Sequence, residues 1–366
     1  TEIYTLSLHD ALPILIPKEY YGRLFTKEQL PVNYHPEALT LEGMIKVDKQ
    51  LRCKRCYSWI EEDWQLPGGQ YYCRACIVFG RNQEGKELYY FPSKTSEIEF
   101  PVLKWFGELT PYQAKVSEKL LRTYQKQKDS LVHAVTGAGK TEMIYNIVAY
   151  VLENKGHVAI ASPRVDVCRE LFLRMKRDFT CSISLLHAES EPYDGSPLVI
   201  ATTHQLLKFY QSFDLVIVDE VDAYPFVGNV MLNHAVEQAK TETGRFIYLT
   251  ATSTLSLEEQ VRLGTLEKHH LARRFHGNPL VLPKLFWQGR LQKSLTRGKL
   301  PRPLLYQIKK QRKSKFPLLI FFPNIAIGEK FTSILQKYLP DEKMAFVSSK
   351  SEKRSTIVEK FRKKEL

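Results

Sequence analysis

The feature that most constrains this chain is a glycine-rich loop, Ala134 to Thr141, with the sequence AVTGAGKT. It follows an apolar run at Leu131–Val135 and opens a helix-like segment, which is the strand–loop–helix context that a phosphate-binding loop needs. Glycines let backbone N–H groups close around phosphate oxygens, and a helix N-terminus adds a favourable field for an anion. A chance glycine-rich turn lacks this flanking pattern. The loop therefore predicts a P-loop nucleotide-binding domain, although Ala134 stands where glycine is usual.

The loop also predicts roles for its individual residues. We expect Lys140 to reach the β and γ phosphates of ATP and Thr141 to ligate Mg²⁺. The residues expected to contact the nucleotide are Thr136, Gly137, Ala138, Gly139, Lys140 and Thr141.

A second nucleotide motif is the apolar run Leu215–Val218, which ends in the carboxylates of Asp219, Glu220 and Asp222. Acidic residues often end strands, so the motif gains its meaning from following a P-loop in the same chain. Asp219 is expected to hold Mg²⁺ through water, and Glu220 to polarise the attacking water. Together with Lys140 these two are the catalytic candidates.

Apolar runs and helical periods alternate from about residue 99 onward. Strand-like runs lie at His157–Ala161, Leu198–Ala201, Leu215–Val218 and Phe246–Leu249. Helix-like segments lie at Pro111–Lys126, Thr141–Glu153, Asp166–Asp178 and Val230–Ala239. This alternation predicts βαβ units and a parallel sheet, so the fold class is α/β.

A second alternating set begins near Phe275. Its expected strands are Leu280–Phe286, Leu318–Phe322 and Met344–Val347. Its expected helices are Leu304–Arg312, Ile327–Tyr338 and a basic segment, Ser351–Leu366.

Four of the six cysteines form two CxxC pairs, and Cys168 and Cys181 lie apart from them. The spacing within residues 51–79 matches a small zinc ribbon, in which four thiolates close the metal's coordination shell. The expected ligands are Cys53, Cys56, Cys73 and Cys76. The cationic side chains of Lys54, Arg55 and Arg74 would partly offset the negative charge of these thiolates. An iron–sulfur site and free thiols are the rival interpretations. The N-terminal region that holds this module is expected to span residues 16–98.

The charge balance allows a polyanionic partner. Lys and Arg total 53 against 40 for Asp and Glu, which gives a net charge of +13. Such a surplus suits nucleic acid or an anionic membrane surface, and it equally suits a basic protein with no such partner. No apolar run approaches the ~20 residues needed to span a bilayer, so we expect a soluble chain whose attachment to a membrane needs a partner.

The first residues are expected to lie outside the protein proper. Tyr4 to Ile14 reads YTLSLHDALPI, and codons for this string resemble a common DNA-sequencing adaptor. We therefore interpret residues 1–15 as a library scar and leave them out of the fold prediction. A short secretory signal is the rival interpretation, but the segment has no basic n-region and no long apolar h-region.

Four further motifs fall in the order of superfamily 2 helicases, and the chain resembles that family. They are Leu109–Gln113, Ala161–Arg164, Ala201–Leu206 and Thr250–Thr252. The resemblance implies a RecA-like ATP-binding domain over residues 99–274, with Gln113 at the adenine edge. It also implies that Arg164, Thr202 and Thr203 hold the DNA backbone. Gln113 equally fits a helix start with Thr110 as N-cap, and both interpretations can hold.

The resemblance continues weakly into residues 275–366, where Leu318–Asn324 looks like motif IV. It implies a partial second RecA-like domain. The family's motifs V and VI should follow, and the second of these supplies an arginine finger. Neither occurs before Leu366, so we expect a C-terminally truncated chain that binds ATP and hydrolyses it poorly.

A cysteine module placed before such a core narrows the resemblance. With the string YYGRLF at Tyr20–Phe25, the Leu51–Cys76 segment is similar to the bacterial late competence ATPases for DNA uptake. That resemblance implies an ATP-dependent translocase in the cytoplasm, at the inner face of the membrane, which pulls single-stranded DNA through a membrane channel. It also implies a phosphoribosyltransferase-like partner from the same operon.

Two other functions stay open. Replication-restart helicases of the PriA type also carry zinc-binding cysteines, but theirs follow the first motor domain, whereas these precede the P-loop. A zinc-containing nucleic-acid-binding module without ATPase activity is the third hypothesis, and the intact Lys140, Asp219 and Glu220 argue against it. Translocation polarity, duplex unwinding and oligomeric state have no signature in the sequence.

Overall fold

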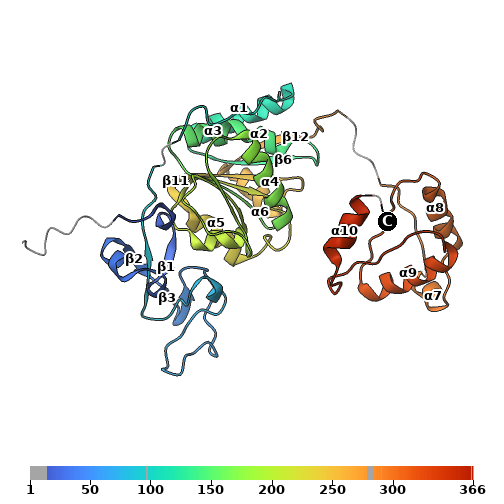
Figure 1. Ribbon diagram of the computed structural model, residues 1–366, viewed down its shortest axis with the longest axis horizontal. Helices are drawn as coiled ribbons and strands as arrows, with labels where there is room; N and C mark the ends of the chain where they lie inside the picture. The colour runs from blue at the N-terminus through green and yellow to red at the C-terminus, as the bar shows by residue number, and fades with distance from the viewer. Residues whose placement is uncertain (1–14, 96–97, 278–282, 290, 364, 366) are drawn as a thin grey trace, which may run out of the picture. The chain divides into compact units, whose positions relative to one another are not determined.

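The computed structural model describes the chain except for residues 1–14, 96–97, 278–282, 290, 364 and 366 (Figure 1). Contacts divide the chain into two compact units, Thr1–Leu280 and Val281–Leu366. Apart from Leu15, the predicted library scar at residues 1–15 lies outside the described residues. Of the helices that are described, none is long and apolar enough to cross a membrane.

A seven-stranded parallel sheet forms the centre of the first unit, with the strand order β12-β6-β11-β10-β7-β9-β8. The predicted α/β class with a parallel sheet is therefore confirmed. The strands are β6 (Asp129–Ala134), β7 (Val158–Ser162), β8 (Ile183–Leu186), β9 (Leu198–Thr202), β10 (Phe213–Asp219), β11 (Lys240–Thr250) and β12 (Leu266–Leu271).

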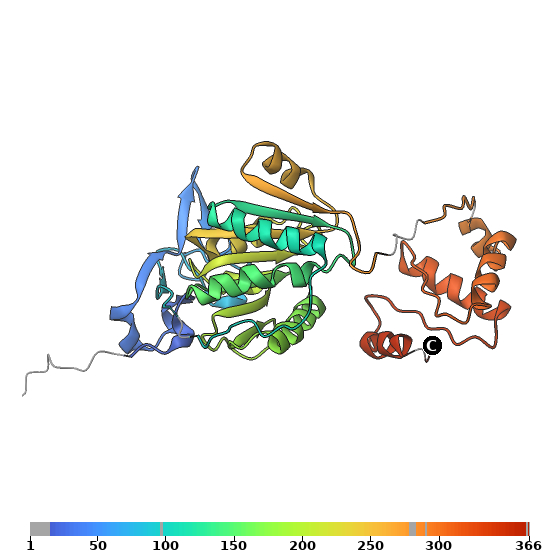
Figure 2. The same cartoon turned by 90° about the horizontal axis from the view of Figure 1, so that it is seen from above.

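Helices flank this sheet in both views (Figure 1, Figure 2). The predicted helix over Thr141–Glu153 is divided at Ile144 into two helices. The helical elements are α1 (Pro111–Gln125), α2 (Lys140–Met143), α3 (Tyr145–Glu153), α4 (Val165–Asp178), η5 (Thr203–Lys208), α5 (Val230–Ala239) and α6 (Leu255–Arg262).

Two hydrophobic cores lie on the two faces of the sheet. In β7, Val158 and Ile160 join the core that contains α1, α3 and α4, whereas Ala159 and Ala161 join the core that contains α5. Alternation with a period of two is what a strand dictates. Since both faces are covered, β7 and β9 are continuous apolar runs, as buried parallel strands are.

The N-terminal region is coloured blue in Figure 1 and carries two small antiparallel sheets. One has the order β1-β5-β2, and the other is the hairpin of β3 and β4, which delivers the first cysteine. Asp48 and Lys49 make the hairpin turn with positive φ angles of 47° and 68°. The elements are η1 (Lys18–Tyr20), β1 (Leu24–Thr26), η2 (Lys27–Gln29), η3 (Val32–Glu37), β2 (Leu39–Glu42), β3 (Met44–Val47), β4 (Gln50–Cys53), η4 (Ile77–Phe79) and β5 (Glu87–Tyr90).

The second unit consists of helices joined by extended segments. Its core is formed by Leu295, Leu300, Ile308, Phe331, Ile334 and Leu335. The helices are α7 (Leu291–Thr296), α8 (Arg302–Arg312), α9 (Ile325–Tyr338) and α10 (Arg354–Arg362).

The strands predicted in this unit are wrong where the structure describes them. Leu318–Phe322 and Met344–Val347 are not paired with any strand among the described residues. The prediction over Leu280–Phe286 lies partly outside the described residues, and its described part is not a strand either. Leu318 and Phe322 pack against the core of the unit, and the Phe322 ring lies 4.8 Å from that of Phe331 in α9, whereas the three residues between them are exposed. A strand requires a hydrogen-bonded neighbour, so the second RecA-like domain stays a prediction.

Candidate nucleotide and metal sites

A cavity of about 930 Å³ opens where several parallel strands end. Parallel strands place all their carboxyl ends at one edge of a sheet, which is where open α/β sheets bind ligands. The P-loop follows β6, the carboxylates follow β10, and Thr250 ends β11. The predicted residues that line this cavity are Gln113, Thr136, Gly137, Gly139, Lys140, Thr141, Arg164, Asp219 and Glu220.

The P-loop has the backbone that its glycines permit. Gly137 and Gly139 have φ angles of +79° and +75°, in the left-handed region that side chains with a Cβ disfavour. A Cβ at Gly139 would also collide with the Gln113 side chain. Lys140 Nζ donates a hydrogen bond to the Ala134 carbonyl at 3.2 Å, so the lysine lies along its own loop. This cradle fits a nucleotide phosphate.

Gln113 ties α1 to this loop. Its Oε1 accepts from the Thr110 N–H at 2.9 Å, and its Nε2 donates to the Ala138 carbonyl at 2.9 Å. The helix-start interpretation is therefore seen directly, as a capping box. Both functional groups of the side-chain amide have partners within the protein, and the contact of Gln113 with adenine stays a prediction.

The carboxylates at the end of β10 differ in environment. Burial raises the pKa of Asp219 to about 6, although the nearby Lys140 ammonium opposes the rise. The Glu220 N–H donates to Asp219 Oδ1 at 2.9 Å. Glu220 Oε2 is buried and has no hydrogen-bond partner among the described residues. A cavity with these two carboxylates beside Lys140 fits a hydrated Mg²⁺ ion and an attacking water.

Thr250 connects the end of β11 to the carboxylate motif. Its Oγ1 lies 2.6 Å from Asp222 Oδ1, and the Thr252 N–H donates to Thr250 Oγ1 at 2.9 Å. The Thr250–Thr252 segment thus touches the acidic loop directly. The hydrogen bond joins the ends of β10 and β11 at the cavity.

The three residues predicted to hold DNA lie at the ends of the neighbouring strands β7 and β9, but of the three, only Arg164 lines the cavity. The Arg164 side chain is 51% exposed and lies in the cavity wall, where it forms ion pairs with Asp166 and Glu220. Thr202 ends β9 and Thr203 begins η5, and both are buried away from the cavity. Contact of all three with DNA stays a prediction.

Some cavity residues carry no signal in the sequence. Trp105 and Phe275 reach the cavity from segments outside the motifs. Arg174 lies there too, where it pairs with Glu142 at 3.3 Å. From the sequence, Arg174 indicates only a surface ion pair with Glu170 one helical turn earlier.

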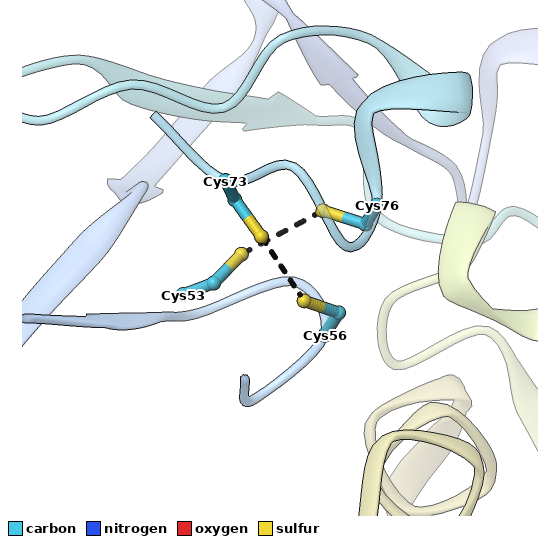
Figure 3. A group of neighbouring side chains, drawn as sticks. All are labelled: Cys53, Cys56, Cys73 and Cys76. Atoms are coloured by element: carbon cyan, nitrogen blue, oxygen red, sulfur yellow. Dashed lines mark hydrogen bonds between the residues drawn. The ribbon is translucent and has the colours of Figure 1, made fainter. Parts of the chain in front are cut away.

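The four predicted metal ligands converge (Figure 3). Their Sγ atoms lie within 4.8 Å of one another, and all four residues are 0% exposed. The Sγ atoms of Cys53 and Cys76 are 3.7 Å apart, and those of Cys56 and Cys73 are 3.4 Å apart. Tetrahedral zinc with Zn–S bonds of about 2.3 Å needs sulfurs about 3.8 Å apart. The geometry therefore fits zinc.

A buried arginine supports the fit of a charged metal centre. Arg55 is 0% exposed, and its Nη1 donates to the Gly80 carbonyl at 2.8 Å. Its Nε and Nη2 are buried with no hydrogen-bond partner, and no carboxylate pairs with it among the described residues. A buried cation needs a counter-charge, and zinc held by four thiolates carries two negative charges. Of the three predicted cations, Lys54 and Arg74 are exposed.

The cysteine module is joined to the sheet domain through α5. The His234 ring stacks on Tyr57 at 4.8 Å, and His234 Nε2 lies 2.9 Å from the Lys54 carbonyl oxygen. The four cysteines belong to the same hydrophobic core as Leu232 and Ala235 of α5. One packed unit thus holds both sites.

Comparison with known proteins agrees with this arrangement. The model of the DEAD/DEAH box helicase family matches residues 110–260. The competence protein ComFA of Streptococcus pneumoniae (strain ATCC BAA-255 / R6) is 53% identical over 351 residues, which cover 95% of this chain and 80% of that protein. The competence protein ComFA of Bacillus subtilis (strain 168) is 33% identical over 317 residues, which cover 84% of this chain and 68% of that protein.

Solved helicase structures overlap with the chain less closely. A DEAD box protein from Methanococcus jannaschii is 15% identical and covers 71% of this chain and 73% of its own, with a TM-score of 0.39. The resemblance to late competence ATPases is confirmed by the two sequence relatives, not by this overlap. With a helicase domain and two such relatives, the chain belongs to the ComFA family of competence proteins.

Proposed function

We propose that the protein is an ATP-dependent motor that drives the uptake of single-stranded DNA during competence. The observation that carries the proposal is the convergence of Lys140, Asp219 and Glu220 on one cavity at the carboxyl edge of the sheet. The names of the two relatives support competence as the process. The net charge of +13 supports a polyanionic cargo.

In this proposal each residue of the cavity has a separate role in ATP hydrolysis. ATP, when bound, supplies the phosphoryl group, and Mg²⁺ offsets its charge. Lys140 binds the β and γ phosphates, while Thr141 and Asp219 hold the metal. Glu220 orients the attacking water and accepts its proton. Thr250 keeps the acidic loop in place through Asp222.

The remaining assignments follow the same proposal. The module over residues 51–79, within the N-terminal region 16–98, binds zinc in a closed site that has a structural role. Residues 99–274 form the ATP-binding domain, and residues 275–366 belong to a second RecA-like domain. The partners are single-stranded DNA, the membrane uptake channel and a phosphoribosyltransferase-like protein, met at the cytoplasmic face. Cysteines that precede the P-loop support this function over replication restart.

The test is a single-turnover ATP hydrolysis assay with this chain in excess over ATP, which detects slow hydrolysis. Oligothymidylate, duplex DNA and no DNA are compared. We expect the single strand to give the fastest hydrolysis, and Glu220→Gln to bind ATP without hydrolysing it. Normal hydrolysis by Glu220→Gln would contradict the assigned chemistry, and stimulation by duplex alone would contradict the single-stranded cargo.

A further inference from the structure

Arg164 and Glu220 meet because their strands are neighbours. Arg164 follows β7 and Glu220 follows β10, and the two strands pair in parallel, so both residues emerge at the same edge of the sheet. Arg164 Nη1 lies 3.6 Å from Glu220 Oε2. At that separation the two charges attract each other, but they form no proper hydrogen bond. An acceptor that forms a hydrogen bond of normal length with Arg164 can therefore displace Glu220.

Glu220 is held in an unusual state. Its φ angle is +56°, in the left-handed region that residues other than glycine rarely adopt. Such conformations persist where the surrounding structure imposes them, and they cluster at functional sites. Among the described residues, Arg164 supplies the only ion pair of Glu220, whose Oε2 has no hydrogen-bond partner. If Arg164 leaves, this oxygen needs a new donor, and a water beside ATP is one.

Arg164 can also be reached from outside. Its side chain is 51% exposed, and Asp166 holds it with two hydrogen bonds of 2.7 and 3.3 Å, from Nη2 and Nε. Asp166 thereby fixes the guanidinium plane while Nη1 makes the weaker contact. An oriented, half-exposed guanidinium is well suited to bind a phosphate oxygen.

We propose that Arg164 is a positioning residue that couples polynucleotide binding to ATP hydrolysis. Arg164 pairs with Glu220 until a backbone phosphate of a single strand binds its guanidinium, and Glu220 then turns to the attacking water. This inference rests on the proposed role of Glu220 in hydrolysis. A charge-assisted hydrogen bond of normal length to phosphate is stronger than a 3.6 Å contact, so the exchange is favourable.

Thermodynamic linkage gives a test that needs no turnover. If Glu220 and phosphate compete for Arg164, weakening the hold of Glu220 must tighten nucleic-acid binding. The affinity for fluorescein-labelled oligothymidylate is measured by anisotropy for the wild type, Glu220→Gln, Arg164→Gln and the double variant. Glu220→Gln should tighten binding about two- to fivefold, the population change that one exposed ion pair produces. The gain should vanish in the Arg164→Gln background.

A matched control separates this coupling from a mere change of charge. Glu170→Gln removes the same charge from the same cavity wall, but Glu170 pairs with Arg174 and not with Arg164. Any gain from this variant should be equal in both backgrounds. An equal gain from Glu220→Gln in both backgrounds, or no gain, overturns the coupling. If Glu220→Gln tightened the binding of ATPγS but not of oligothymidylate, Arg164 would bind a phosphate of the nucleotide instead. That result would also overturn the coupling.

Hydrolysis gives a second readout. Arg164→Gln should raise the single-turnover rate without nucleic acid about two- to fivefold and lower the stimulation by oligothymidylate. Arg169→Gln, an exposed change on the same helix, should alter neither. If Arg164→Gln leaves both quantities unchanged while Glu220→Gln is inactive, the coupling fails and the proposed function stands. If the wild type does not bind oligothymidylate, both fail.

Discussion

The four-cysteine site and the nucleotide cavity belong to one compact unit, but the first is closed to solvent and the second is open. The cysteines are 0% exposed, and their ligand atoms lie within 4.8 Å of one another. The cavity has a volume of about 930 Å³, and charged groups such as Lys140, Arg164 and Glu220 line it. A closed ligand set gives stability, whereas an open set keeps charges available for a substrate. Changes in the first should therefore affect folding, and changes in the second should affect binding.

The largest expected effect is the loss of the metal. Cys73→Ser removes one of four thiolates, and we expect the N-terminal region to lose on the order of 5 kcal/mol of folding free energy. Chemical denaturation with and without a chelator, together with zinc analysis, measures this. Cys168→Ser is the matched control, since Cys168 lies outside the cluster. Full stability of Cys73→Ser with no bound zinc would remove the structural role of the site.

Lys140→Ala should weaken nucleotide binding and leave the stability of the fold nearly unchanged. The change removes the cation that we propose binds the β and γ phosphates, so the affinity for ATP should fall about 100-fold or more. The midpoint of thermal unfolding should barely move, because Lys140 is a partly exposed residue at the cavity. Calorimetric titration with ATPγS measures the affinity, and thermal denaturation measures the unfolding midpoint. A destabilised protein that retains its ATP affinity would reverse the contrast between the two sites.

Arg55→Met tests whether the buried guanidinium serves the metal. If Arg55 balances the charge of the thiolates, the affinity for zinc should fall about tenfold, as it does when outer-shell partners are lost. Competition with a chromophoric chelator measures the affinity. Arg74→Gln, which removes a half-exposed cation paired with Asp63, should change it little. Should Arg55→Met bind zinc as tightly as the wild type, Arg55 would be an uncompensated charge.

The smallest expected effect is a pH dependence confined to the open site. Burial raises the pKa of Asp219 to about 6, so this carboxylate takes up a proton as the pH falls through that value. If Asp219 holds Mg²⁺ as proposed, its protonation removes that ligand, so Mg²⁺-dependent nucleotide affinity at limiting Mg²⁺ should fall as the pH drops through about 6. Titration of a fluorescent ATP analogue from pH 5 to 8 follows the loss. Asp219→Asn should flatten the profile, and an unchanged profile would remove Asp219 as the titrating group.

Local motifs and contacts between distant segments differ in how far the sequence predicts them. The four cysteines lie in two short segments, and their CxxC spacing by itself indicates a metal site. The P-loop and Asp219 were equally predictable, because each motif is local to one strand and the turn after it. The pairing of Arg164 with Glu220 was not, because it depends on β7 lying beside β10, and strand order is not written in any local pattern.

The fold shows the same limit. The central strands β7, β9 and β10 are largely apolar and were predicted within a few residues. The edge strands β8 and β12 were missed, since β8 is short and β12 carries the polar run Glu267–His270. In the second unit, apolar runs such as Leu318–Phe322 were mistaken for strands. Leu319 and Phe321 of this run are exposed, because an apolar run forms a buried strand only where a neighbouring strand pairs with it.

The stack of Tyr57 on His234 gives the cysteine module a packed route toward the cavity. Helix α5 begins at Val230, shortly after the acidic loop, and it carries His234 against the first cysteine knuckle. The cysteine module and the acidic loop are therefore connected through one helix, whose residues Leu232 and Ala235 share a hydrophobic core with the four cysteines.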